Sequence, residues 1–503
     1  MASDCGCQAL ARKAGSPGKM VATMSRWASS WALISAVAAM ALGCHRSAPA
    51  AGPIVLIVVD TLRADHLSCY GYGRPTSAAM CALAADGVRF DRAYTTRTST
   101  TPAIASMLTG LYPHRHGVKD VLLLLPTAIT TVTKRIQAAG WATGGFVSSF
   151  VMVRDFNGFE AGFDVYDDDV RTRELVRENY QRDAPETVLR AATWLRRHGP
   201  RAFLFVHLIE PHGPYTPPAP YLERFALPAT GPEPGDIPAY QRLPGVRTVS
   251  EYVGRYDGEI AAADAALAEL FEHLRGLGWY DQATIVLVAD HGESLGEENL
   301  WFRHGTGVHD AEARVPLIVK FPAGRGPTPG TVIHTPVSVI DVYPTLLSAA
   351  GVAENSGPRA AVDLARVAAG EMRTEPPVTE FEEGDAVTLA IHGDRCTGRW
   401  QLPLNAVDDP AFAAAGGGSW SAAARQLRID PPGTDGQCSQ AAAAEAGALI
   451  VDRLRFRLEV PVIARNDMRD ALNRTRFIDA RIRSGPTVDA HEHEALRQLG
   501  YAE

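Results

Sequence analysis

Four segments of the chain are almost continuously apolar: residues 53–60, 202–210, 283–290 and 314–321. Runs of this length without alternating polar positions are typical of strands that are covered on both faces in a parallel sheet. Between them lie stretches with helical periodicity. The clearest is 250–277, where Ala, Leu and Phe recur at helical spacing and Gly278 follows the last turn.

Alternating strands and helices predict an α/β fold, a three-layer sandwich with a mostly parallel central sheet. The 503 residues provide ample material for a large domain and a smaller second unit. The character of the sequence changes near residue 352. We therefore expect a catalytic domain at 53–352, a connector at 353–375 and a smaller C-terminal α+β unit at 376–503.

Polar side chains stand at the ends of three predicted strands. The first ends in Asp60, the second runs into Glu210-Pro211-His212, and the third ends in Asp290-His291-Gly292-Glu293. A single Asp after a strand is usually a turn residue or a helix cap. Ligands of open α/β sheets bind beyond the carboxyl ends of the strands, however, so three such ends together predict a functional site. The Pro- and Gly-rich stretch 211–249 is either a loop over this site or a surface insertion.

The segment TSTTPAIASMLTG (98–110) has the pattern of a helix start. Pro102 suits the first turn, which places the N-cap at Thr100 or Thr101. A helix N-terminus also binds oxyanions and stabilises a developing alkoxide. A threonine hydroxyl becomes a useful nucleophile only when a base or a metal activates it. Thr100 is therefore either a helix cap or a nucleophile beside a metal.

The N-terminal region predicts export. Met24 is a plausible alternative start, Ser25-Arg26 is a short basic region, and 27–42 is a mostly apolar run. This run is short for a spanning helix and suits a secretory signal, here 1–43. Its Ala41-Leu42-Gly43-Cys44 ending resembles a bacterial lipobox, which implies a lipoprotein of the periplasm or cell surface, anchored to the membrane through a lipidated Cys44 with 44–52 as a tether. An ordinary signal peptide cut nearby is the alternative.

The cysteines and the charge add little more. Four cysteines remain beyond Cys44, and this even number agrees with an oxidising compartment. A Cys396–Cys438 disulfide is plausible, and Cys69 is equally compatible with a buried thiol; Cys81 is the fourth. The net charge of −8 argues against a nucleic-acid binder, whose surface would be basic. Nothing in the sequence indicates a protein partner.

Six ordered blocks carry a family resemblance. They are VVDTLRADHLSCYGY (58–72), TTPAIASMLTGLYPHRHGV (100–118), FVHLIEPHGPYTPP (205–218), DHGESLGE (290–297), RHGTGVHDAEARVPLIV (303–319) and VIDVYPTLLSAAG (339–351). Together they resemble the sulfatase family of the alkaline phosphatase superfamily, which implies an alkaline phosphatase/sulfatase-like fold and an enzyme that acts on anionic ester substrates. Six blocks in family order are far more specific than one motif.

The resemblance also implies roles for individual residues. Asp60, Asp290 and His291 match metal-binding positions. Thr100 matches the catalytic cysteine or serine that sulfatases convert to formylglycine. His212 and His304 match basic residues that contact the anionic group or the leaving oxygen of the substrate.

Three departures from the family pattern shift the expected chemistry. The signature Cys/Ser-x-Pro-x-Arg is here Thr100-Thr-Pro-Ala-Ile104, the usual second Asp after the first strand is Thr61, and 119–150 contains no Lys-x-His. Formylglycine is therefore not expected. A threonine beside Asp, Asp and His is instead similar to phosphotransferases and phosphodiesterases of the superfamily. We expect substrate specificity to be determined by the loops at 119–180 and 211–249.

The leading hypothesis is a metal-dependent hydrolase or transferase that uses Thr100 on phosphodiesters, phosphonates or related oxyesters. A sulfuric ester hydrolase without formylglycine is one alternative, and a degenerate, non-catalytic binding lipoprotein is another. We expect one divalent metal ion held by Asp60, Thr100, Asp290 and His291. A His ligand among carboxylates suits Zn²⁺ or Mn²⁺, whereas a sulfatase-like site more often holds Ca²⁺.

Overall fold

The computed structural model describes residues 52–121, 123–170, 172–173, 180–353, 360–383, 386–393, 397–403 and 428–430. The predicted signal peptide, the lipidated Cys44 and the Cys396–Cys438 disulfide lie outside these residues. In the described part of the chain, no helix is both long enough and apolar enough to cross a bilayer.

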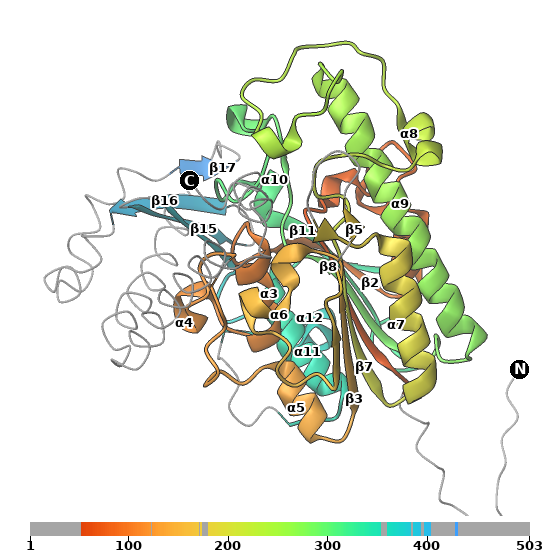
Figure 1. Cartoon of the computed structure of the whole chain (residues 1–503). Helices are drawn as coiled ribbons and strands as arrows, with labels where there is room; N and C mark the ends of the chain where they lie inside the picture. The colour runs from red at the N-terminus through yellow and green to blue at the C-terminus, as the bar shows by residue number, and fades with distance from the viewer. Residues whose placement is uncertain are drawn as a thin grey trace, which may run out of the picture. The chain divides into compact units, whose positions relative to one another are not determined.

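A twisted sheet forms the centre of the molecule (Figure 1). In the described residues it has nine strands, in the order β12-β2-β11-β8-β1-β7-β3-β4, with β13 also paired to β2. Their bounds are Thr331–Ile333 (β12), Val88–Tyr94 (β2), Arg314–Lys320 (β11), Thr284–Ala289 (β8), Ile54–Val59 (β1), Ala202–Leu208 (β7), Ala142–Val147 (β3), Val165–Asp167 (β4) and Val337–Ser338 (β13).

The four predicted strands are β1, β7, β8 and β11, which confirms the mostly parallel central sheet. Every side chain of β1, β7 and β8 is buried, as the continuous apolar runs require. One direction differs from the sequence-based expectation: β11 runs antiparallel to both of its neighbours. An apolar run reports burial on both faces but not strand direction, so the pattern could not reveal this.

Helices cover both faces of the sheet and complete the three layers (Figure 1). One layer holds α2 (Ala78–Asp86), α7 (Ala184–His198) and α9 (Val249–Gly276); the other holds α3 (Thr100–Thr109), α5 (Val132–Ala138) and α11 (Val342–Ala349). Helix α9 matches the predicted helix closely. It begins with a capping box in which Thr248 and Glu251 bind each other's backbone N–H, and Gly278 just beyond it has a positive φ.

The C-terminal region forms a separate small sheet against the large domain. Strands β14 (Val378–Glu383), β15 (Ala386–His392), β16 (Thr397–Pro403) and β17 (Arg428–Asp430) pair antiparallel in this order. The Thr379 hydroxyl donates to the Thr95 carbonyl, and the Glu380 N–H donates to the Thr96 carbonyl. The predicted connector contains a short helix, α12 (Leu364–Ala368).

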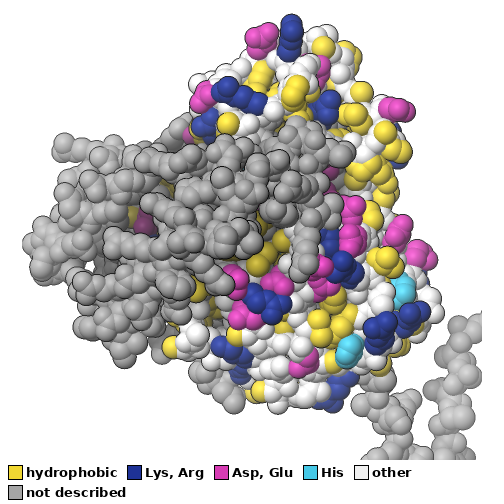
Figure 2. All heavy atoms as spheres, in the orientation of Figure 1, with side chains coloured by type: hydrophobic (Ala, Val, Ile, Leu, Met, Phe, Trp, Pro, Cys, Tyr) yellow, Lys and Arg dark blue, Asp and Glu magenta, His cyan; other side chains and the backbone are white. Residues whose placement is uncertain are grey.

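A disulfide joins Cys69 to Cys81. Cys69 is therefore not the buried thiol that the sequence allowed. The bond ties the turn after β1 to helix α2, two segments whose Cα atoms at the cysteines are 5.4 Å apart. Elsewhere on the visible face, acidic and basic side chains of the described residues lie interspersed (Figure 2), as is typical of a solvated surface.

Candidate metal centre and active site

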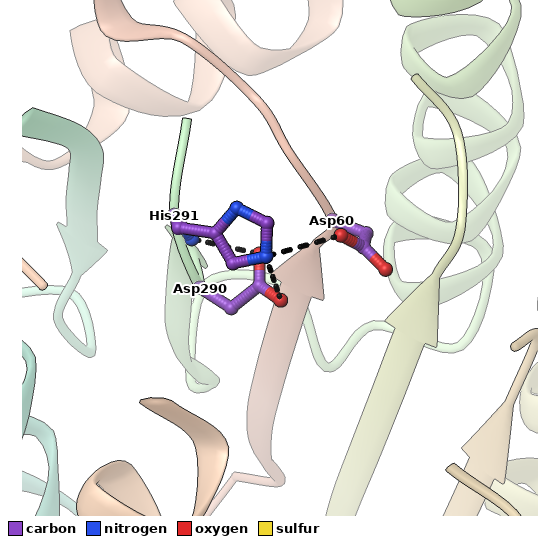
Figure 3. Close-up of side chains that lie close together, drawn as sticks. All are labelled: Asp60, Asp290 and His291. Carbon is purple, nitrogen blue, oxygen red and sulfur yellow. Dashed lines mark hydrogen bonds and ion pairs between the residues drawn. The ribbon is translucent and has the colours of Figure 1, made fainter. Parts of the chain in front are cut away.

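Strand register brings the two aspartates together. Strands β1 and β8 are parallel neighbours with Val59 opposite Ala289, so the next residues, Asp60 and Asp290, leave the sheet side by side. His291 follows directly. Its Nε2 lies 3.7 Å from Oδ1 of Asp60 and 3.5 Å from Oδ2 of Asp290. All three side chains are buried and point toward one another (Figure 3).

The surrounding backbone fixes which atoms face this cluster. Oδ1 of Asp290 accepts from the N–H groups of Thr61 (3.2 Å) and His291 (2.8 Å), which leaves Oδ2 for the centre. Nδ1 of His291 lies 2.9 Å from the Gly292 carbonyl oxygen. A carbonyl can only accept, so Nδ1 carries the hydrogen and Nε2 presents a lone pair.

These residues fit a divalent cation. One ligand atom from each of Asp60, Asp290 and His291 lies within 4.8 Å of the others. Both carboxylate oxygens of Asp60 and Oδ2 of Asp290 are buried without a hydrogen-bond partner in the described structure. Burial, together with the charges of Asp290 and Glu293, raises the pKa of Asp60 well above its usual range. Unpaired buried carboxylates are costly, and a cation bound between them would remove that cost.

Thr61 stands where the family has a second aspartate, and it acts through its backbone. Its N–H donates to Asp290, and its carbonyl accepts from the Tyr256 hydroxyl at 2.6 Å. Its φ of 52° is the left-handed conformation, which is rare for a β-branched residue. Such strain is tolerated where the surroundings fix the backbone, commonly at functional sites.

Thr100 faces the same cluster. It is the first residue of α3, and the N-cap is Ser99, so the prediction of an N-cap at Thr100 or Thr101 was wrong by one or two residues. The Thr100 hydroxyl is consequently not used for capping. Its Oγ1 lies 3.3 Å from Nε2 of His291, in a buried position. The neighbouring Thr101 hydroxyl donates instead to the Val121 carbonyl.

His304 and His212 form a row that leads away from the cluster. The ring centroid of His304 lies 4.6 Å from that of His291 and 5.0 Å from that of His212. Nδ1 of His304 lies 3.1 Å from Oε1 of Glu293. Burial, with His291 nearby, lowers the pKa of His304 to about 3, and burial raises the pKa of Glu293 to about 8. The structure thus brings together the six residues for which the family resemblance implied a role: Asp60, Thr100, His212, Asp290, His291 and His304.

Sequence reasoning named Glu210 and Glu293 at this edge without giving either a role, and it missed His207. Oε1 of Glu210 accepts from the Ala184 N–H at 2.8 Å, so it serves the start of α7 rather than the site. Glu293 is central, because it contacts His304 and accepts from the Tyr215 hydroxyl at 3.0 Å. His207 in β7 also approaches the cluster. Its only sequence signal is a polar residue inside an apolar run.

The stretch 211–249 lies over part of the site. It contains a helix, α8 (Ala219–Phe225), and a 3₁₀ turn, η4 (Ala239–Gln241). From this turn, Nε2 of Gln241 comes within 3.4 Å of Oε2 of Glu293, and the Tyr240 ring lies 6.1 Å from the His212 ring. Of the two interpretations of this stretch, these contacts favour a loop that covers the site.

The three-layer fold and the buried carboxylate–imidazole cluster at the strand ends have the arrangement of an α/β enzyme whose site lies beyond the carboxyl ends of the strands. The family model described as Sulfatase matches residues 53–352, more than half of the chain. The chain therefore belongs to the sulfatase family, whose members hydrolyse esters and depend on metal.

The similar proteins include one named as a sulfatase and one named as a phosphonate monoester hydrolase. The choline-sulfatase of Rhizobium meliloti is 28% identical over 384 residues, 65% of this chain and 73% of that protein. The multifunctional alkaline phosphatase superfamily protein PehA of Trinickia caryophylli is 26% identical over 378 residues, 58% of this chain and 73% of that protein. The phosphonate monoester hydrolase structure of Agrobacterium radiobacter matches with a TM-score of 0.57 at 19% identity, covering 72% of this chain and 93% of that one; this likeness concerns the fold alone.

Proposed function

We propose that this chain hydrolyses or transfers phosphodiester, phosphonate or related oxyester groups, with Thr100 as the nucleophile. The observation that carries the proposal is the position of the Thr100 hydroxyl, 3.3 Å from Nε2 of His291 at the edge of the metal-binding cluster. This hydroxyl stands at a helix N-terminus, where backbone N–H groups favour bound oxyanions.

Asp60, Asp290, His291 and Thr100 would hold one divalent ion, which when bound lowers the pKa of the threonine hydroxyl and polarises the ester. Two carboxylates and one imidazole suit Zn²⁺ or Mn²⁺. Ca²⁺ prefers six to eight oxygen ligands, roughly twice the number that these side chains offer.

The proposed reaction has two steps, the formation of an ester on Thr100 and its release. The Oγ–P bond forms as Thr100 attacks in line, the bond from phosphorus to the leaving oxygen breaks, and the hydroxyl proton passes to solvent. His304 and His212 form a row beside the cluster, and each would hydrogen-bond the substrate oxygens in its protonated form; the leaving oxygen takes its proton from one of them, and solvent replaces that proton. Water or an acceptor alcohol then attacks the phosphorus and restores Thr100, giving hydrolysis or transfer respectively.

The identity of Thr100 favours phosphorus over sulfur. A formylglycine hydrate has a second hydroxyl that expels sulfate from the enzyme, and a sulfothreonine has none. The chain also has Ile104 where sulfatases carry the arginine that holds the modified residue. A phosphothreonine ester, by contrast, is released by direct attack on phosphorus.

A substrate panel tests the proposal. Purified full-length protein should cleave chromogenic phosphodiesters or phosphonates faster than aryl sulfates, and Thr100→Ala should abolish the activity. Mass spectrometry of enzyme quenched during turnover should locate the covalent adduct on Thr100. Full turnover by Thr100→Ala would sink the proposal, and a preference for aryl sulfates would favour a sulfuric ester hydrolase without formylglycine. A protein that binds no metal and cleaves nothing would support the binding lipoprotein.

We also propose export and lipid anchoring through Cys44. The Cys69–Cys81 disulfide supports an oxidising compartment, because stable disulfides are rare in the cytosol. Metabolic labelling with a fatty acid should mark the wild-type chain in the membrane fraction and leave Cys44→Ser unlabelled. Equal labelling of both proteins would contradict the lipoprotein assignment.

A further inference from the structure

His207 is a buried polar residue without a visible role. It lies in the middle of the sheet on β7, is fully buried, and neither of its ring nitrogens has a hydrogen-bond partner in the described structure. A buried polar group without a partner costs free energy comparable to a lost hydrogen bond. This cost indicates that the imidazole has a partner in the functional state.

Other buried histidines of the described chain differ in this respect. Nε2 of His116 lies 2.9 Å from the Ser106 hydroxyl. His392 uses both nitrogens, at 3.0 Å from the Thr379 hydroxyl and 3.1 Å from the Thr397 hydroxyl. These are structural histidines with satisfied nitrogens. His207 does not follow their pattern.

The register of the sheet points His207 at the metal centre. Strand β7 pairs with β1 so that His207 stands opposite Val58. Asp60 is two residues beyond Val58, so its side chain leaves the same face of the sheet as that of His207. Nε2 of His207 lies 3.8 Å from Oδ2 of Asp60, while Oδ1 of the same carboxylate lies 3.7 Å from Nε2 of His291. The two oxygens of Asp60 therefore face two different imidazoles.

His207 does not belong to the trio whose ligand atoms all lie within 4.8 Å of one another. It approaches the cluster on the Oδ2 side of Asp60. A separation of 3.8 Å is too long for a hydrogen bond, but a movement of about 1 Å brings the pair into range. A neutral imidazole carries one N–H, which is the donor that the free Oδ2 lacks.

We propose that His207 is a positioning residue of the metal centre: it donates an N–H to Oδ2 of Asp60 and so turns Oδ1 toward the metal. The inference rests on the metal site of the proposed function. It reverses the common arrangement in which a carboxylate orients a metal-binding histidine. Loss of such outer contacts typically weakens metal binding by about 10–100-fold.

Metal affinity tests this role without reference to turnover. Metal-free full-length protein is titrated with Zn²⁺ or Mn²⁺ against a chromogenic chelator, for wild type, His207→Leu and His207→Gln. We expect His207→Leu to bind about 10–100-fold more weakly. His207→Gln retains an N–H donor and should recover most of the affinity. The metal-free Leu variant should unfold at the wild-type temperature or above, because leucine removes the two unpaired ring nitrogens of His207 from the core.

His392→Leu is the matched control, since it makes the same change at a buried histidine of the small sheet. It breaks two hydrogen bonds, so it should lower the unfolding temperature of the metal-free protein and leave the metal affinity unchanged. If His207 had only a structural role, His207→Leu would likewise leave the metal affinity unchanged. Equal affinity of His207→Leu and wild type overturns the positioning role and leaves the metal site intact.

A crystal structure of Zn²⁺-loaded wild type provides a second test that needs no variant. A separation of about 2.7–3.2 Å between Nε2 of His207 and Oδ2 of Asp60 supports the inference. A separation that remains beyond hydrogen-bond range overturns it. Failure of wild type to bind any divalent metal would overturn the metal site and the role of His207 together.

Discussion

The Oγ1 atom of Thr100 lies 3.3 Å from Nε2 of His291, and both side chains are buried. The first comes from the start of a helix and the second from the loop after a central strand. Only the folded sheet places these two elements together. The pair links the proposed nucleophile to the proposed metal site, and the predictions below follow from it and from its surroundings.

Replacing Thr100 separates a chemical role from a structural one. Thr100→Val keeps the shape of the side chain but removes the oxygen, so kcat should fall by at least about 10³-fold while the unfolding temperature changes little. Thr100→Ser retains the hydroxyl and should keep measurable activity. The adjacent Thr101→Val loses only a hydrogen bond to a carbonyl, and steady-state kinetics should show it active. Comparable losses at the two positions would contradict the nucleophile assignment.

Removal of the metal should affect stability as well as activity. Without a cation, Asp60 and Asp290 form a pair of buried carboxylates with unpaired oxygens. Dialysis against a chelator should therefore abolish turnover and lower the unfolding temperature. Readdition of Zn²⁺ or Mn²⁺ at 100 times Kd should restore about 2.7 kcal/mol of stability in thermal or denaturant unfolding. Unchanged activity after complete chelation, verified by elemental analysis, would count against metal dependence.

His304 should matter most for poor leaving groups. If it helps to protonate the leaving oxygen, His304→Ala will slow an alkyl phosphodiester more than a p-nitrophenyl one, because p-nitrophenolate needs little protonation. Loss of a general acid typically costs about 10²–10⁴-fold on the poor leaving group. His334→Ala, at an exposed histidine paired with Asp91, is the control. An equal loss for both leaving groups would assign His304 to binding rather than to proton transfer.

Glu312 should make stability depend on acid pH. Burial by itself raises the pKa of this carboxyl, but contacts from His309, Ser294 and Thr306 outweigh burial and hold the pKa at about 2. The ordinary value is about 4.5, so the carboxylate stabilises the folded state above that pH. This contribution, on the order of 3 kcal/mol, is lost as the pH falls from about 4.5 to about 2.

Glu312→Gln tests this dependence. It should be less stable than wild type at pH 7, and the difference should shrink toward pH 2.5 in denaturant unfolding. A difference that is the same at both pH values would show that the charge of Glu312 contributes nothing.

Gly292 should tolerate no side chain. A Cβ there would lie 2.0 Å from the Ala311 carbonyl oxygen. Gly292 directly follows His291, so a shift of this backbone would move the candidate site. Gly292 also donates to the Glu312 carbonyl at 2.7 Å. Gly292→Ala should therefore displace His291, reduce metal affinity, and cost about 1–3 kcal/mol of stability, measured by unfolding and by chelator competition. Gly276→Ala, at a glycine with open space around it and no positive φ, is a suitable comparison for metal affinity.

The sequence predicted the centre of the fold well because burial has a simple signature. Continuous apolar runs located β1, β7, β8 and β11, and the strand ends located Asp60 and Asp290. It could not give the direction of β11, since burial on both faces is the same for either direction. It also placed the N-cap of α3 one or two residues late, because Ser99, Thr100 and Thr101 are all acceptable caps.

The outer parts of the site were less accessible to sequence reasoning. Asp60 directly follows β1, whereas Glu210 lies two residues after the end of β7, and its side chain turns to helix α7. Neighbouring residues of a strand point to opposite faces of the sheet, so a shift of one residue places a carboxylate on the other face. The partnership of Cys69 with Cys81 likewise depends on where α2 packs, which no spacing reveals. The catalytic roles of the six site residues stay predictions.

The pairing of β1 with β8 has a consequence for how the enzyme acquires its metal. Asp60 and Asp290 become neighbours only after the chain between them has been made and the two strands have joined in the sheet. An incomplete or unfolded chain therefore offers no preformed site for an ion to occupy. Whichever divalent ions surround the protein when it folds will compete for the site, so the place of folding helps to decide which metal the finished enzyme carries.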